Sequence, residues 1–283
     1  MEQSDREQAR RAVGEGGARL VRLLREGDPA AQVAGSQWRV ADVASHLAYV
    51  FRGFTEAAVG NSAQFARYVP DEPDFHRRLA TVNGALVQEL ADSAGDQQSA
   101  VAIGMVEEGI AGFLAATASL DPEAALDTPW YGPGVTRTTD TLTALALGEI
   151  LVHGLDIART SATPWPIERS EATVVAREVF ARMLPLMLTD AGRRAEVSYR
   201  ISWRGAPRSS PDLVVRLSAG TVTTGPAGPG ERVDCRVLAD PVAFLLVGYG
   251  RSSTWREVLA GRILAWGRRP WAAARLPQLF CRP

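Results

Sequence analysis

The sequence predicts a two-part α+β protein, in which an all-α bundle precedes a smaller unit of mixed helix and strand. Up to about residue 160 apolar residues recur at helical spacing, whereas beyond about residue 195 they alternate as in strands. The segment TSATPWPIERS (160–170) lies between these textures, and its two prolines are typical of a linker. Helices first and strands later indicate two domains, which we place at 1–165 and 166–283.

The first domain is expected to consist of helices, each with an apolar stripe. In WRVADVASHLAYVFRGF, for example, Val43, Leu47 and Val50 fall on one face. The polar segment RYVPDEPD ends this region, and the turn-rich LDPEAALDTPWYGPGVT precedes the last helix. The expected helices span about 5–26, 38–54, 74–94, 98–119 and 141–158.

The second domain is expected to contain strands between helices. AEVSYRISWRG, DLVVRLSAGTVTTG and RVDCRVLA alternate as strands do, and TWREVLAGRILAWG suggests a short element followed by a last strand. A leading helix is expected at about 171–188 and a closing helix in PWAAARLPQLF. DPVAFLLVGYGR predicts a further helix, with Asp240 as its N-cap and Pro241 at its first position.

The composition limits the compartment and the partners. The fractions of hydrophobic (46%) and charged (22%) residues are ordinary for a globular chain, and a net charge of −1 argues against a nucleic-acid partner. No run reaches the ~20 apolar residues that span a bilayer, and the N-terminus lacks a signal peptide's apolar core, so no membrane partner is expected. Cys235 and Cys281 are in no metal-ligand spacing, which favours reduced thiols. We therefore expect a cytoplasmic protein, either a monomer or a homodimer.

The segment GEILVHGLDIA (148–158) places three ionisable groups in a run otherwise suited to a protein core. On a helix Glu149 and His153 lie four residues apart, so they share the face on which the apolar residues should point inward. An isolated buried carboxylate costs several kcal/mol unless it is protonated, ion-paired or bound to a metal. Since no arginine shares this stripe near Glu149, a metal would satisfy the carboxylate best.

A second helix also presents a histidine inward. His46 lies three residues after Val43 and four before Val50, on the apolar stripe of its own helix. Two imidazoles and a carboxylate are a zinc-type donor set that leaves one position open, and helical bundles commonly hold metals between facing helices. We therefore predict a divalent-metal site formed by His46, Glu149 and His153.

Asp156 and Asp42 are the expected supporting groups, because each lies within one helical turn of a histidine and could orient its ring. Zinc is the expected metal, although iron, cobalt or nickel accept the same donors. Two plainer interpretations stay open at this point. A Glu-x-x-x-His pair on a helix is often a surface contact, and a single inward histidine is often a hydrogen-bonded core residue.

Three motifs stand out along the chain: SQWRVADVASHLAYV (36–50), GEILVHGLDIART (148–160) with PWPIE, and DPVAFLLVGYGRSSTWREVLAGRILAWGRRPW (240–271). They resemble the mycothiol-dependent maleylpyruvate isomerase family over nearly the whole chain, most loosely between about 55 and 125. The resemblance implies a DinB-like metal-binding four-helix bundle followed by a small α+β domain similar to sterol carrier protein type 2. It also implies that His46, Glu149 and His153 are the metal ligands.

The resemblance implies an enzyme that uses mycothiol, a low-molecular-weight thiol, together with a small-molecule substrate. Metal coordination would supply the thiolate at neutral pH, where a free thiol with a pKa of about 8.5 is mostly protonated. The thiolate could add to an activated double bond, allow rotation and leave, which is a cis–trans isomerisation; without elimination the reaction would be S-transfer. The family also places an arginine of the second domain in the active site. Arg251, in GYGRSS, is the candidate catalytic residue, with Arg262 and Arg268 as further candidates and a salt bridge as the alternative role of each.

Two other functions remain open. With zinc hydroxide in place of the thiolate, the same bundle would be a metal-dependent hydrolase. Alternatively the protein is a non-catalytic small-molecule or lipid-binding protein, whose second domain accommodates an apolar ligand and whose metal is structural. The loop WYGPG (130–134) is either a lining of the substrate site or a structural turn.

Overall fold

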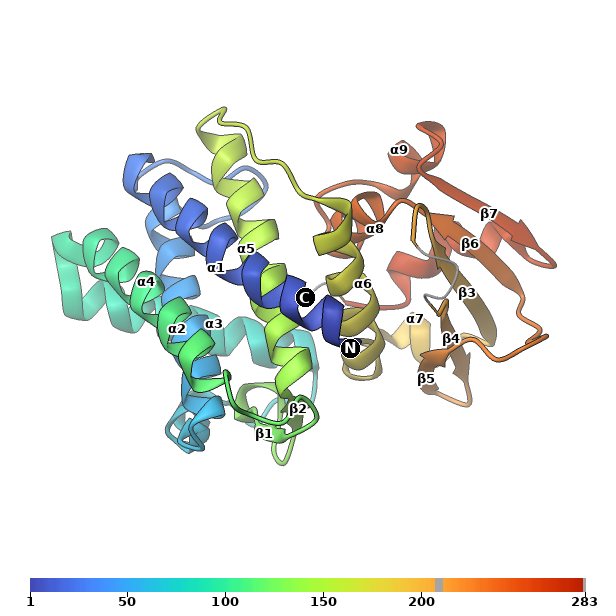
Figure 1. Ribbon diagram of the computed structural model, residues 1–283, viewed down its shortest axis with the longest axis horizontal. Coiled ribbons are helices and arrows are strands. Elements are labelled where there is room, and N and C mark those ends of the chain that lie inside the picture. The colour runs from blue at the N-terminus through green and yellow to red at the C-terminus, as the bar shows by residue number, and fades with distance from the viewer. Residues whose placement is uncertain (207–210, 282–283) are drawn as a thin grey trace. The chain divides into compact units, whose positions relative to one another are not determined.

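The computed structural model describes residues 1–206 and 211–281 of the chain. The chain divides into two compact units, Met1–Pro166 and Ile167–Pro283 (Figure 1). The division falls within the segment TSATPWPIERS, one residue after the predicted domain boundary.

Four helices form the bundle of the first unit, and a fifth, α3 (Phe75–Ala94), packs against two of them, α2 and α4. In the bundle α1 and α2 each pack against both α4 and α5. The bundle helices are α1 (Gln3–Glu26), α2 (Val40–Ala58), α4 (Gln98–Ala116) and α5 (Thr139–Thr160). Two short 3-10 helices, η1 (Ser62–Tyr68) and η2 (Gly95–Gln97), lie between them. Every predicted helix of this unit is confirmed, with ends shifted by a few residues.

The helix α5 lies in the core of the bundle, and most of its residues are buried. It begins after Thr138, whose hydroxyl accepts a hydrogen bond from the backbone N–H of Thr141 at 3.1 Å and so caps the helix. By length and composition alone, Phe75–Ala116 and Thr139–Thr160 could cross a membrane, in contrast to the expectation of no membrane-spanning run. The second stretch is mostly buried inside the bundle, and η2 divides the first into two helices, so both are weak evidence for a membrane span.

A small antiparallel ribbon precedes α5. β1 (Ala125–Asp127) pairs with β2 (Thr136–Thr138), and the 3-10 turn η3 (Pro129–Tyr131) lies in the connection. The sequence predicts only a turn here, because strands of three residues carry too little alternation to be recognised.

The predicted linker is not a loose connection in its first half. Trp165 is buried against Gly154 of α5, and its indole N–H donates to the backbone oxygen of Leu151 at 3.1 Å. The guanidinium carbon of Arg19 lies 4.1 Å from the centroid of the Trp165 ring, at cation–π distance. This tryptophan therefore fixes the end of the first unit to α5, a non-local contact that the local sequence does not reveal.

The second unit is built on a five-stranded sheet with the strand order β5-β4-β3-β6-β7. β3 and β6 are parallel, and all other neighbours are antiparallel. Along β3, buried Tyr199, Ile201 and Trp203 alternate with less buried Arg200 and Ser202, so one face of the sheet lines the core. The strands are β3 (Val197–Trp203), β4 (Leu213–Ser218), β5 (Thr221–Pro226), β6 (Cys235–Ala239) and β7 (Ile263–Gly267).

Helices complete the second unit, and α6 packs against α8, β4 and β5. α8 begins as predicted, because the Asp240 carboxylate accepts hydrogen bonds from the backbone N–H groups of Val242 and Ala243, and Pro241 occupies the first turn. The helical elements are α6 (Arg169–Met183), η4 (Leu184–Leu186), α7 (Asp190–Arg193), α8 (Pro241–Gly248), α9 (Thr254–Leu259) and η5 (Pro270–Gln278).

Two helix predictions in this unit are wrong in part, and proline explains both. The helix expected over 171–188 ends at Met183, and Pro185 follows in the 3-10 turn η4. The closing helix is the 3-10 helix η5, with Pro277 inside it. Because proline lacks an N–H and its ring clashes with the preceding turn, a regular α-helix does not continue through it.

Candidate metal centre

His46 lies on the buried face of α2. The helix begins after Arg39, whose backbone N–H donates to the Asp42 carboxylate at 2.9 Å in a capping arrangement. One turn after Asp42, the His46 residue is only 7% exposed, and its neighbours Val43 and Leu47 are buried too. Helix periodicity thus turns this imidazole toward the interior of the bundle.

Glu149 and His153 come from the core helix α5. They are one helical turn apart, and Nε2 of His153 lies 3.2 Å from Oε2 of Glu149. Their side chains are 15% and 20% exposed for His153 and Glu149, respectively, so both groups are largely withdrawn from water. The interpretation of this pair as an exposed surface contact is therefore wrong.

The three predicted ligands converge although α2 and α5 are far apart in the sequence. Nε2 of His46 lies 3.3 Å from the same Oε2 of Glu149 that contacts His153. The two imidazole rings have centroids 5.1 Å apart and meet edge to face. One potential ligand atom from each of the three residues lies within 4.8 Å of the other two.

These distances fit a divalent cation. In a tetrahedral zinc site with bonds of about 2.0–2.2 Å, neighbouring ligand atoms lie about 3.3–3.5 Å apart. The Glu149 oxygen lies 3.3 and 3.2 Å from the two imidazole nitrogens, close to that spacing. Three protein donors leave one tetrahedral position open, which distinguishes a reactive site from a closed structural one.

Charge interactions among the side chains of the cluster outweigh the effect of their burial on their pKa values. Burial opposes ionisation of Glu149, but hydrogen bonds and charge from His153 and His46 hold the pKa of its carboxyl well below the usual range. Burial likewise opposes protonation of His153, yet Asp156 and Glu149 outweigh it and raise the pKa of the imidazole to about 9. Without a cation, the cluster therefore holds an ionised glutamate beside a protonated histidine. This ion pair is the plain alternative to a metal for satisfying the buried carboxylate.

Asp156 lies beside His153, as the spacing on α5 predicts. Its Oδ2 is 3.6 Å from Nδ1 of His153, the ring nitrogen that does not contact Glu149. This separation is longer than a normal hydrogen bond, and Nδ1 is a buried nitrogen without a hydrogen-bond partner among the described residues. The contact is therefore an electrostatic one, which a small movement of either side chain would turn into a hydrogen bond.

Asp42 contacts Arg39 and Gln98, whereas its spacing from His46 predicts that it supports that imidazole. Its carboxylate receives hydrogen bonds from the backbone and side chain of Arg39 and, at 3.3 Å, from the amide of Gln98. These contacts hold the start of α2 and join it to α4. Asp42 thus serves the N-terminus of the helix that carries His46, a structural role that its position in the sequence does not predict.

Two aromatic residues lie near the site: Trp38, which the sequence does not assign to it, and Tyr131, from the loop WYGPG for which the sequence leaves a lining of the substrate site open. The Trp38 ring, which is partly exposed, has its centroid 5.2 Å from that of His46. Tyr131 is buried, and burial together with the negative charge of Glu149 raises the pKa of its phenol. Trp38 precedes α2 and Tyr131 belongs to η3, so no helical period relates either residue to the ligands.

The first aromatic residue of the loop WYGPG, Trp130, has a structural role. Trp130 is buried, and its ring contacts those of Phe54 and Phe65. Tyr131, which also contacts the Trp130 ring, is the residue of this loop that lies within electrostatic range of Glu149.

Arg251, the predicted catalytic arginine, belongs to the second unit. It follows α8, and its Nη1 donates to the backbone oxygen of Tyr249 at 2.6 Å. Its catalytic role stays a prediction.

The fold and the converging donors together define a helical-bundle protein with a candidate His–Glu–His metal centre, joined to an α+β unit. The sequence model of the mycothiol maleylpyruvate isomerase N-terminal domain matches residues 10–158, more than half of the chain. The chain therefore belongs to the mycothiol maleylpyruvate isomerase family, an enzyme family, and the predicted resemblance is confirmed.

Solved structures agree on the fold. The chain is similar to the crystal structure of the mycothiol-dependent maleylpyruvate isomerase, with 15% identity, 92% of each chain covered and a TM-score of 0.50. A histidine-to-alanine mutant of that enzyme matches with 13% identity, the same coverage and a TM-score of 0.52. No curated protein matches by sequence. The predicted fold class, a helical bundle followed by a small α+β domain, is confirmed.

Proposed function

We propose that this protein is a metal-dependent enzyme that activates mycothiol for isomerisation of, or S-transfer to, an electrophilic small molecule. The observation that carries the proposal is the convergence of His46, Glu149 and His153 in a chain of the mycothiol maleylpyruvate isomerase family. An open position beside these donors favours a ligand such as a thiol. The low cysteine content, with Cys235 and Cys281 in no metal-ligand spacing, supports a cytoplasmic location.

The residues of the proposed site have different roles in metal binding, ring orientation and substrate recognition. His46, Glu149 and His153 would hold the cation, for which zinc is our candidate because two histidines and one glutamate are a known donor set of catalytic zinc sites. When bound, such a cation lowers the pKa of a coordinated thiol, so that a thiolate is available at neutral pH. The chain itself supplies the negative charge of Glu149, and Asp156 would orient the ring of His153 and fix its tautomer. Arg251 is our candidate for recognising an anionic acceptor.

Metal analysis of the purified protein is the first test. We expect about one divalent cation for each chain, and its loss from a variant that combines His46→Ala, Glu149→Ala and His153→Ala. Glu107→Gln, on the exposed surface of α4, is the matched control and should retain the metal. Full occupancy in the triple variant would refute the site.

Thiol binding separates this proposal from a hydrolase. Calorimetric titration of the metal-loaded protein with mycothiol should show saturable binding that the triple variant lacks. A hydrolase has no need of the thiol, so absence of binding would favour that alternative. A subsequent survey of electrophiles, including maleylpyruvate followed by proton NMR, distinguishes cis–trans isomerisation from formation of a stable thioether.

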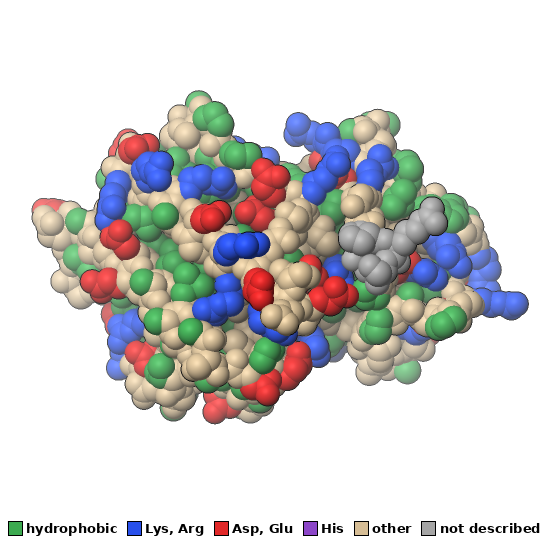
Figure 2. Space-filling model, in the orientation of Figure 1, with side chains coloured by type: hydrophobic (Ala, Val, Ile, Leu, Met, Phe, Trp, Pro, Cys, Tyr) green, Lys and Arg blue, Asp and Glu red, His purple; other side chains and the backbone are tan. Residues whose placement is uncertain are grey.

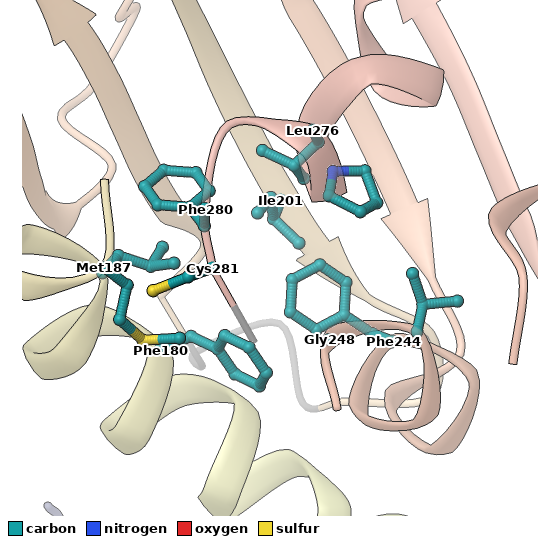
Figure 3. A pocket seen from close by; sticks show the side chains of 11 residues that line it. Phe180, Met187, Ile201, Phe244, Gly248, Leu276, Phe280 and Cys281 are labelled. Carbon is teal, nitrogen blue, oxygen red and sulfur yellow. The ribbon is translucent and has the colours of Figure 1, made fainter. Parts of the chain in front are cut away.

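A cavity in the second unit favours a second candidate function, the binding of an apolar ligand. The cavity holds about 560 Å³ of space, part of which is open to solvent, between residues of α6, η4, β3, α8 and η5. Figure 3 shows the side chains of Phe180, Phe244 and Phe280 around it. Its eleven lining residues are nearly all apolar and include no charged side chain, so a ligand there would be held by hydrophobic burial.

Displacement of a fluorescent fatty acid tests this second candidate. Leu276→Trp would place a larger ring at the wall of the cavity and should weaken binding about tenfold or more. Leu259→Trp, at an 86% exposed position outside the cavity, is the control and should bind normally. Equal binding by both variants, or no binding by the wild type, would exclude the cavity as a ligand site.

A further inference from the structure

The two units carry opposite charge, which the net charge of −1 conceals. Residues 1–166 contain 13 arginines and 22 acidic residues, whereas residues 167–283 contain 18 arginines and 10 acidic residues. Such an asymmetry between the parts of a chain points to an anionic partner for the basic part. It also explains why the composition of the whole chain predicts no such partner.

Exposed apolar side chains gather in one region of the basic unit. The described residues include seven exposed large hydrophobic side chains, and five of them lie on the consecutive elements α9, β7 and η5. Tryptophan supplies three of the five, with 46% to 66% of each residue exposed. We call the following residues the β7 surface: Trp255, Leu259, Leu264, Trp266 and Trp271.

Regular geometry explains why these side chains face outward together. Trp255 and Leu259 are four residues apart on α9 and share one helix face, and Leu264 and Trp266 are two apart on β7 and share one face of the sheet. β7 is the edge strand of the sheet, and both α9 and η5 pack against it. The three elements that carry the five side chains therefore meet at one edge of the sheet, where proteins seldom leave apolar side chains without a partner.

The charged groups around the β7 surface are arranged with the positive ones outermost. Glu257 and Asp234 are buried, and each is paired with arginine. Their partners stay in solvent, since 46% of the Arg262 side chain and 75% of the Arg268 side chain are exposed. Arg236 is directly opposite Trp266 on the neighbouring strand. In Figure 2, blue side chains prevail over red ones on the part of this unit with β6 and β7.

We propose that the β7 surface docks onto a membrane surface rich in anionic phospholipid. Tryptophan and leucine side chains insert at the boundary between head groups and acyl chains, while arginines bind the phosphates above them. A second copy of the chain fits this surface less well, because a symmetric dimer would bring two arginine-rich surfaces together. A nucleic acid fits less well because Leu259, 86% exposed, and Leu264 offer nothing to stack on a base.

Vesicle sedimentation with the full chain tests the proposal. The protein should sediment with vesicles of phosphatidylcholine and phosphatidylglycerol, but not with phosphatidylcholine alone. Binding should fall as salt is raised toward about 1 M, where the Debye length is about 3 Å. Leu259→Ser should weaken binding about tenfold, and addition of Trp266→Ser should weaken it further. Since Leu259 is almost fully exposed, its replacement leaves the fold intact.

The matched control removes exposed apolar side chains from the acidic unit. Val59→Ser with Val101→Ser, at positions 60% and 41% exposed, should bind vesicles like the wild type. Equal weakening in both sets of variants would overturn the proposal, as would equal binding to vesicles with and without phosphatidylglycerol. A dimer that Leu259→Ser dissociates in sedimentation velocity, or tighter binding to a single-stranded oligonucleotide than to vesicles, would replace the membrane by another partner.

Discussion

Asp156 lies one helical turn beyond His153, and its Oδ2 is 3.6 Å from Nδ1 of that imidazole. A carboxylate at the far nitrogen of a ligating histidine fixes the ring and raises its basicity, and its loss typically weakens metal binding 10- to 100-fold. We therefore expect Asp156→Asn to lower the metal affinity by about that factor. Competition with a chromogenic chelator at fixed pH measures the change.

The second predicted supporting carboxylate provides the comparison. Since Asp42 contacts Arg39 and Gln98, Asp42→Asn should lower the stability of the bundle by about 0.5–2 kcal/mol and change the metal affinity little. If both variants lose affinity equally, Asp42 acts on the ligands as well as on the helix end. If neither loses affinity, Asp156 does not support the site.

Metal binding should release a proton. In the metal-free site the pKa of His153 is raised to about 9 from 6.5, and a cation needs the neutral imidazole. The apparent metal affinity should therefore increase about tenfold per pH unit for one displaced proton, and level off above about pH 9. Calorimetry in two buffers with different ionisation enthalpies counts the protons, and a pH-independent affinity without proton release would contradict this view.

The stability of the metal-free protein should change with pH in the opposite direction. The folded pKa of His153 is above its unfolded value, so its contribution is complete below about pH 6.5 and is lost as the pH rises through about 9. Denaturation by urea across this range, with chelator present, measures the loss. The variant His153→Gln should show a flatter profile over the same window.

The sequence predicts the convergence of the three donor residues because the signal is local on two helices. The four-residue spacing of Glu149 and His153 places both on the inner face of α5, and the same period places His46 on the inner face of α2. Three ionisable groups on buried helix faces need charged partners or a metal. This need predicts that the side chains of the two helices meet.

What the sequence does not predict depends on contacts between distant segments. Trp38 reaches His46 from outside the helix. For the loop WYGPG the sequence leaves open whether it lines the site, and the fold is what brings Tyr131 near Glu149. Trp165 packs on Gly154, although the prolines on either side of it suggest a flexible linker. Each contact depends on how distant segments of the backbone come together, so the helical or strand periodicity of the sequence does not predict it.

An ion pair between α1 and the start of α5 should contribute to stability. Nε and Nη2 of Arg6 donate to the buried Asp140 carboxylate at 2.6 and 2.9 Å. Asp140→Asn leaves Arg6 without its counter-charge and should cost about 2–4 kcal/mol in the free energy of unfolding at pH 7. Glu107→Gln, in an exposed pair with Arg25, is the control and should cost about 1 kcal/mol or less.

The sign of the pH dependence separates this ion pair from simple packing. Burial opposes ionisation of Asp140, but Arg6 holds the pKa of its carboxyl below the usual value of 3.8. The stabilisation is therefore present above about pH 4 and is lost as the pH falls through the lowered pKa. The difference between wild type and Asp140→Asn in urea denaturation should shrink in acid. A difference that is constant with pH would mean that packing, and not charge, is responsible.

Gly154 should tolerate no side chain, because a Cβ there would lie 2.1 Å from the Trp165 ring. Gly154→Ala must displace the indole from Leu151 and from the surface of α5, and overpacking of this kind costs about 1–3 kcal/mol or more. Gly84→Ala in α3 is the matched control, since nothing lies within 4 Å of its added Cβ and alanine favours a helix by about 0.5–1 kcal/mol. Thermal unfolding should thus show a lower Tm for the first variant and an equal or higher Tm for the second. Equal shifts in both would show that Trp165 is not held against α5.

Since Gly154 follows His153 directly, the first variant should also weaken metal binding, whereas the second should leave it unchanged.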